Sequence, residues 1–156
     1  MIMRMLRCLA MILTLAPVMG SAQDFDDGTV AYNAGDLATA ARVWMRLAEQ
    51  GDAEAQLAIG SMYDLGLGVP QDFAEAAKWF RLSAEQGNAD AQGKLAYTYQ
   101  RGEGVPQDYV EAAKWFRLSA EQGDAGSQHS LGSMYRYGQG VPQDNVSAHM
   151  WFNLVF

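Results

Sequence analysis

The stretch GDAEAQLAIGSMYDLGLGVPQDFAEAAKWFRLSAEQ, residues 51–86, decides the fold, because it returns almost unchanged at residues 87–122 and begins again at Gly123. The step is 87 − 51 = 36 and 123 − 87 = 36 residues, and Trp79, Trp115 and Trp151 keep it. A period of this size is typical of repeat proteins, in which each unit stacks its apolar face on its neighbours. The function is therefore expected on an extended surface rather than in a compact catalytic pocket.

Each period predicts two helices joined by short turns. The first helix begins after a capping residue and ends at a glycine; the caps are Asp52, Asn88 and Asp124, and the glycines are Gly66, Gly102 and Gly138. A Gly-x-Gly-Val-Pro-Gln-Asp connection follows, and its proline cannot continue the helix. Asp72 with Glu75 resembles a capping box that begins the second helix, which ends near Gly87.

The apolar positions agree with two packed helices. They recur at helical spacing in the first helix at Gln56, Ile59, Gly60 and Tyr63, and in the second at Phe73, Ala76, Ala77, Phe80 and Ala84. Trp79 lies beside the second stripe. Because a Trp and a Phe recur in every unit at this spacing, we expect them in the core rather than in a cofactor or ligand box.

The recurring pattern resembles a known family. Ala-x-Ala-Gln-x-x-Leu-Gly-x-x-Tyr-x-x-Gly-x-Gly-Val-x-x-Asp-x-x-x-Ala-x-x-Trp-Phe-x-x-Ala-Glu-x-Gly is similar to the Sel1-like repeat, a relative of the tetratricopeptide repeat. The resemblance implies an all-α, right-handed α-solenoid that serves as an adaptor for protein–protein interaction. We expect repeats at residues 53–88 and 89–124 and an incomplete C-terminal repeat at 125–156. Residues 23–52 resemble a degenerate N-terminal repeat, in which Trp44 takes the place of Phe80.

Residues 1–22 are predicted to be a cleavable signal peptide. Arg4 and Arg7 precede an apolar run over residues 8–19, and Gly20 and Ala22 place small residues at −3 and −1 of a cleavage site. The run is short for a membrane-spanning helix, and a retained anchor is the alternative. We therefore expect a mature chain that starts near Gln23, is periplasmic or secreted, and has no stable membrane insertion. It would contain no cysteine, so packing alone must stabilise it.

Charge and residue types exclude several functions. The formal charge of −7 becomes −9 once Arg4 and Arg7 are removed, so the chain repels phosphate backbones and nucleic acid is not expected as a partner. Neither histidine is paired with another His or Cys at metal-ligand spacing. His129 lies close in the chain to Ser127, Ser130 and Asp124, but neighbours on one helix rarely aim at a common atom. No catalytic residue, metal ligand or cofactor is predicted.

Differences between the units point to a binding face. The second helices are nearly identical, whereas the first helices differ at positions 54, 58, 61 and 65 and their equivalents, which share one helix face. The residues expected to contact a partner are Glu54, Ser61, Leu65, Asp90, Lys94, Tyr97, Arg101, Arg136 and Tyr137. Free drift of an exposed face is the alternative. Tyr97, flanked by Lys94 and Arg101, is the best candidate, because an exposed aromatic between cations is typical of interaction hot spots, here for an acidic or aromatic-rich segment.

Two function classes follow from the sequence. The favoured one is an exported, non-enzymatic module that binds a peptide or protein in its concave groove. The alternative is a cell-envelope enzyme or glycan-binding protein acting on peptidoglycan. A hydrolase would need paired carboxylates or a nucleophile in a cleft, and the acidic residues here are mostly expected as caps and solvated surface.

Overall fold

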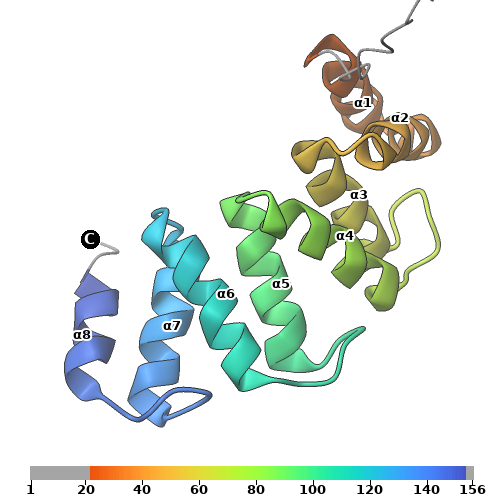
Figure 1. The fold of residues 1–156 in the computed structure, drawn as a ribbon. Helices are drawn as coiled ribbons and strands as arrows, with labels where there is room; N and C mark the ends of the chain where they lie inside the picture. The colour runs from red at the N-terminus through yellow and green to blue at the C-terminus, as the bar shows by residue number, and fades with distance from the viewer. Residues whose placement is uncertain (1–21, 154–156) are drawn as a thin grey trace, which may run out of the picture.

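The computed structural model describes residues 22–153, which form eight helices and no strand. The helices are α1 (Ala22–Asn33), α2 (Leu37–Glu49), α3 (Ala53–Leu65), α4 (Phe73–Glu85), α5 (Ala89–Arg101), α6 (Tyr109–Glu121), α7 (Ala125–Tyr137) and α8 (Asn145–Asn153). Each helix packs mainly on the helices before and after it, so the hairpins follow one another along a curved array (Figure 1). The all-α solenoid is confirmed. The predicted signal peptide lies outside the described residues, except that α1 begins at Ala22.

The first helices begin and end where the sequence predicts. The Asp52 carboxylate accepts a hydrogen bond from the Ala55 amide at 2.8 Å, and Asn88 and Asp124 cap the next two first helices in the same way. Gly66 adopts the left-handed conformation with φ 67°, and its amide donates to the Met62 carbonyl. A residue with a Cβ is disfavoured in that conformation, which explains the glycine at this position.

The second helices are capped differently from the prediction. Asp72 accepts hydrogen bonds from two first-turn amides at 2.9 and 3.0 Å. The prediction of a capping box is wrong for Glu75, whose side chain was expected to accept the Asp72 amide. That amide donates instead to the Tyr63 carbonyl at 2.9 Å. Glu75 pairs instead with Lys78, and this hydrogen bond raises the pKa of the Lys78 ammonium above its ordinary value.

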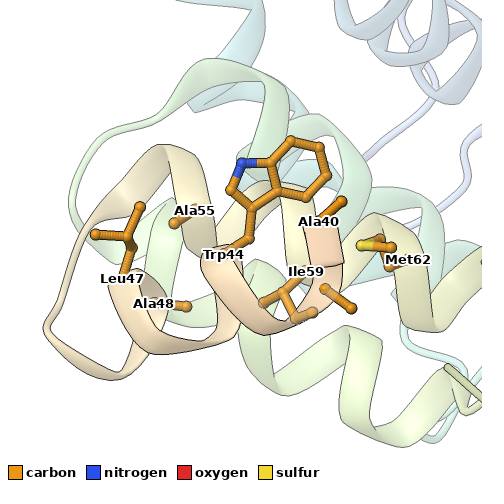
Figure 2. Packing of buried hydrophobic residues seen from close by; sticks show 8 residues of the cluster. Ala40, Trp44, Leu47, Ala48, Ala55, Ile59 and Met62 are labelled. Carbon is orange, nitrogen blue, oxygen red and sulfur yellow. The ribbon is translucent and has the colours of Figure 1, made fainter. Parts of the chain in front are cut away.

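The core is a row of clusters between successive helices. Figure 2 shows the cluster in which Trp44 and Leu47 of α2 pack with Ile59 and Met62 of α3. Trp44 is buried at the position that Phe80 holds in α4, so the N-terminal hairpin fills the same place with a larger ring. Gly28 on α1 makes room for it, since a Cβ there would lie 2.4 Å from the indole nitrogen.

Of the three recurring tryptophans, Trp151 is buried in the core and the other two lie at its edge. Phe80 and Phe116 are fully buried, whereas Trp79 and Trp115 are half-buried and pack against the clusters from outside. Trp115 touches two clusters, one formed with the preceding unit and one formed with the following unit. The indole N–H groups of both tryptophans are buried without a hydrogen-bond partner among the described residues.

A buried glutamine in each unit joins that unit to the previous one. The Gln92 side-chain amide donates to the Ala84 carbonyl of the preceding unit at 3.2 Å, and its oxygen accepts from Gln122 of its own unit at 2.8 Å. Gln56 and Gln128 make the equivalent bond to the carbonyl at the end of the preceding second helix. The sequence places these glutamines in an apolar stripe, and the structure shows that they form a polar seam within the core.

The connections also dock on the preceding unit. Gly104 has φ 73°, and a Cβ on it would lie 2.1 Å from the carbonyl oxygen of Phe73, at the start of the preceding second helix. Gly68 and Gly140 make the same close approach. Glycine is thus required here both for its backbone conformation and for the contact between units.

Two alanine substitutions separate these requirements. Gly87 also has a positive φ, 94°, but nothing lies within 4 Å of the place of its Cβ. We expect Gly87→Ala to lower the free energy of unfolding by about 1–2 kcal/mol, the cost of the left-handed conformation alone. Gly104→Ala should cost about 1–3 kcal/mol more, because the helix it touches must move. Urea denaturation followed by circular dichroism measures both, and equal losses would contradict the docking role of Gly104.

Candidate functional site

The face of the first helices that the sequence comparison singles out is hollowed. A cavity of about 320 Å³, called here the middle hollow, lies across α3, α5 and the start of α7. Its lining residues are Leu57, Ser61, Asp90, Gly93, Lys94, Tyr97, Asp124 and Gly126.

Two smaller hollows adjoin the middle one. The apolar hollow, of about 130 Å³, is lined by Tyr32, Trp44, Ala58, Ser61, Met62, Leu65 and Leu67. The charged hollow, of about 230 Å³, is lined by Asp64, Phe80, Lys94, Tyr97, Thr98, Arg101 and Glu103. The middle hollow shares Ser61 with the apolar hollow and shares Lys94 and Tyr97 with the charged hollow. The three therefore adjoin one another in a row along the first helices, and this row is called here the first-helix groove.

The apolar and charged hollows are the same feature one period apart. Six lining residues of the apolar hollow lie 36 positions before six lining residues of the charged hollow. The pairs are Trp44 and Phe80, Ala58 and Lys94, Ser61 and Tyr97, Met62 and Thr98, Leu65 and Arg101, and Leu67 and Glu103. The backbone frame repeats while the chemistry changes from apolar to charged. The groove thus offers different environments to different parts of one bound segment.

Two glycines that depart from the repeat line the middle hollow. Gly93 is equivalent to Leu57 and His129 in the other units, and Gly126 is equivalent to the acidic residue Glu54. A Cβ added to Gly126 would lie 3.8 Å from the Tyr97 hydroxyl, so a longer side chain there would enter the hollow.

Tyr97 is not the exposed aromatic that the sequence suggests. Its ring is half-buried and packs edge-on against Phe116, with centroids 4.8 Å apart. Its hydroxyl is hydrogen-bonded to Ser130 Oγ at 2.8 Å, which also buries Ser130 on a face that was expected to be exposed. The Arg101 guanidinium lies over the Tyr97 ring at 5.6 Å and 3.7 Å from the Glu103 carboxylate. Tyr97 therefore forms a wall of the groove that is fixed in place by the next unit.

The charges of the middle hollow are mixed. Asp90 is exposed, and one oxygen of Asp124 accepts the Ser127 amide at 2.6 Å as the cap of α7. The Lys94 ammonium makes no hydrogen bond or ion pair with residues 24–153. Two carboxylates and one ammonium thus face the same cavity.

The structure gathers six of the nine expected contact residues along the groove: Ser61, Leu65, Asp90, Lys94, Tyr97 and Arg101. Glu54 is exposed and lines none of the hollows described here. Arg136 lines a separate hollow of about 290 Å³ against α8, and its guanidinium lies 5.7 Å over the ring of the exposed Tyr137.

The sequence comparison missed several lining residues. Position 57 varies strongly between units, as Leu57, Gly93 and His129, and this variation is the signal that could have added it to the face. Asp124 was assigned only as a cap, although it also lines the middle hollow. Trp44, on a second helix, also lines the apolar hollow. No variation between units could have predicted this, because it depends on how the hairpins pack.

Residues that could suggest catalysis do not converge. The His129 ring packs against Phe152 with centroids 5.4 Å apart, whereas Ser127 Oγ donates to Ser119 Oγ at 2.8 Å. Among residues 22–153, no group of three or more His, Cys, Asp or Glu side chains is placed to hold a metal ion. No helix in that range has the length and apolar character needed to cross a membrane.

Comparison with known proteins identifies the family. The model of the Sel1 repeat matches residues 53–88, 89–124 and 125–154. The chain belongs to the Sel1 repeat family. Its repeats are of the kind that commonly serves as a protein–protein interaction module. The chain has no significant match among the curated proteins.

Solved structures agree with this assignment. The chain is 39% identical to c5321, a protective antigen present in uropathogenic Escherichia coli strains displaying an SLR fold, with a TM-score of 0.83 over 87% of this chain and 30% of that one. A Sel1 repeat protein from Oxalobacter formigenes is 32% identical, with a TM-score of 0.80 over 86% and 54%. Helicobacter pylori cysteine rich protein B shares the fold, with a TM-score of 0.55 and 16% identity over 69% and 96%. The chain spans 30% and 54% of the first two relatives' lengths.

The position of Tyr97 generates a stability prediction. Tyr97→Phe should lower the free energy of unfolding by about 1 kcal/mol, because buried Ser130 loses its partner. Tyr97→Ser, which introduces the residue of the neighbouring units, should cost about 2–3 kcal/mol through the lost ring contact with Phe116. Ser61→Ala, whose hydroxyl bonds only within its own helix, is the control and should change stability by less than about 0.5 kcal/mol. Urea denaturation measures all three, and a fully stable Tyr97→Ser variant would mean that the ring is not a structural wall.

Proposed function

We propose that this Sel1 repeat chain is an exported, non-enzymatic interaction module that binds a peptide or protein segment in the first-helix groove. The arrangement of the hollows carries the proposal, since adjoining hollows share Ser61, Lys94 and Tyr97. A row of adjoining hollows with changing chemistry suits an extended segment, whose successive side chains enter successive hollows. The departure from the repeat at Gly126, which leaves space beside the Tyr97 hydroxyl, further supports binding at this place.

The alternative, an enzyme or glycan-binding protein acting on peptidoglycan, has less support. A hydrolase of that class needs two carboxylates or an activated nucleophile free to act at one point. Asp124, one of the two carboxylates at the middle hollow, is engaged as a helix cap, and Ser127 is bonded to Ser119. These engagements favour the binding role.

Export is supported by the N-terminal sequence pattern and by the kind of protein that the chain resembles. Residues 1–22 have the charge, apolar run and small residues of a signal peptide. The E. coli relative is a protective antigen, and antigens that raise protective responses are typically accessible outside the cytoplasm.

Export has a direct test. Residues 1–24 fused to a reporter that is active only outside the cytoplasm should give activity, and the processed fusion should begin near Gln23. The same reporter fused to a segment that starts at Gln23 is the control and should stay inactive. An uncleaved fusion retained in the membrane would instead support an anchor.

Binding in the groove is tested by filling the middle hollow. Gly126→Gln places a side chain into the hollow with ordinary contacts at its Cβ, so the fold should be kept. Peptides selected from a displayed random library on the wild-type chain should bind this variant at least about tenfold more weakly. Leu118→Gln, which adds the same amide to an exposed site on α6 away from the groove, is the control and should bind normally. Peptides that bind Gly126→Gln as tightly as the wild type would contradict binding at this place.

A further inference from the structure

The middle hollow combines an apolar floor with an acidic rim. Leu57, Gly93 and the ring of Tyr97 supply apolar surface, and the carboxylates of Asp90 and Asp124 line the same cavity. Its volume of about 320 Å³ gives it room to receive a long side chain. An occupant that fits must therefore be both long and apolar along its stem and positive at its end.

We infer that the middle hollow receives an arginine side chain of the segment bound in the groove; this inference rests on the proposed function. The methylene stem of arginine would lie on Leu57 and Gly93, since long basic side chains bury their stems on apolar surface. The guanidinium forms charge-assisted hydrogen bonds with carboxylates, and Asp90 and the Asp124 oxygen that does not cap α7 line the hollow.

Lys94 does not block this occupant. Its side chain lines both the middle and the charged hollow, and the charged hollow holds the carboxylates of Asp64 and Glu103. Lysine has a flexible four-carbon stem, so its ammonium can turn towards that side when a second cation enters. The formal charge of −7 on the whole chain adds long-range attraction for a basic segment.

Charge also decides against the acidic segment that the sequence suggests. That expectation rested on Lys94 and Arg101 acting together. The Arg101 guanidinium is engaged by Glu103 and by the Tyr97 ring, so it lines the charged hollow as part of an existing pair. Lys94 alone then faces two carboxylates in the middle hollow, and the balance there favours a cation.

The probes that test this are two peptide mixtures made of uncharged residues at every position but one, which is fixed as arginine in one mixture and as glutamate in the other. Binding is measured at physiological ionic strength, because exposed charges are screened over about 8 Å there. The wild-type chain should bind the arginine mixture at least about fivefold more tightly than the glutamate mixture, a difference in the range of exposed charge pairs.

The test variant is the pair Asp90→Asn with Asp124→Asn. Asn88 caps α5 in the native chain, so asparagine at position 124 should keep the cap of α7. The matched control is Asp52→Asn with Glu54→Gln, which makes the same change of charge and of cap in α3, where neither residue lines the groove. The arginine preference should fall to about twofold or less in the test variant, which removes the charge pairs, and should persist in the control.

Other outcomes separate the inference from the proposed function. Tighter binding of the glutamate mixture, lost in Lys94→Ala, would overturn the arginine assignment and leave groove binding intact. An arginine preference that falls equally in the test and control variants would also overturn it, because the effect would then come from total charge. If neither mixture binds the wild-type chain, both the inference and the proposed function are overturned.

Discussion

A buried glutamine fixes each unit of the solenoid to the unit before it. Gln92 donates to the carbonyl of Ala84, near the end of the preceding helix, which also accepts the Gly87 amide at 3.0 Å. A buried amide is stabilising only when it is bonded, so any other register of stacking would leave Gln92 unsatisfied. Gly104 adds a second constraint, because its connection can approach Phe73 only without a Cβ. The glutamine hydrogen bond and the close glycine contact both recur every 36 residues, and this explains why the sequence repeats so closely.

The same constraint leaves the first-helix face free to differ. Stacking engages the second helices and the buried side of the first helices, so positions such as 58 and 65 carry no part of the seam. A hollow that is apolar around Ala58 and Leu65 can therefore become charged around Lys94 and Arg101 without a change of backbone. Most residues that stabilise the solenoid are thus separate from those that can recognise a partner, and Tyr97, which lines the groove and bonds the next unit, belongs to both sets.

The repeat, the helix ends and most of the core could be predicted from the sequence, because they depend on contacts within one period. Asp52 and Gly66 act locally, and their roles are readable from residue type and position. The placement of Tyr97 could not be predicted, since its hydroxyl bonds Ser130, 33 residues away in the next unit. The capping box could not be ruled out from the sequence for a similar reason. The Asp72 amide is bonded to the Tyr63 carbonyl, which only the folded connection brings near.

Adjoining hollows that share side chains should also influence one another. Tyr97 and Lys94 separate the middle hollow from the charged hollow, and Tyr97 is held by Phe116 and Ser130. A fixed wall of this kind keeps the two hollows distinct, whereas the flexible Lys94 can respond to what occupies either one. Recognition along the groove would then depend on the order of side chains in the bound segment as well as on their number. A repeat protein gains specificity in this way from small changes at equivalent positions, because a change at a shared position, such as Ser61 or Tyr97, alters the chemistry of two neighbouring hollows at once.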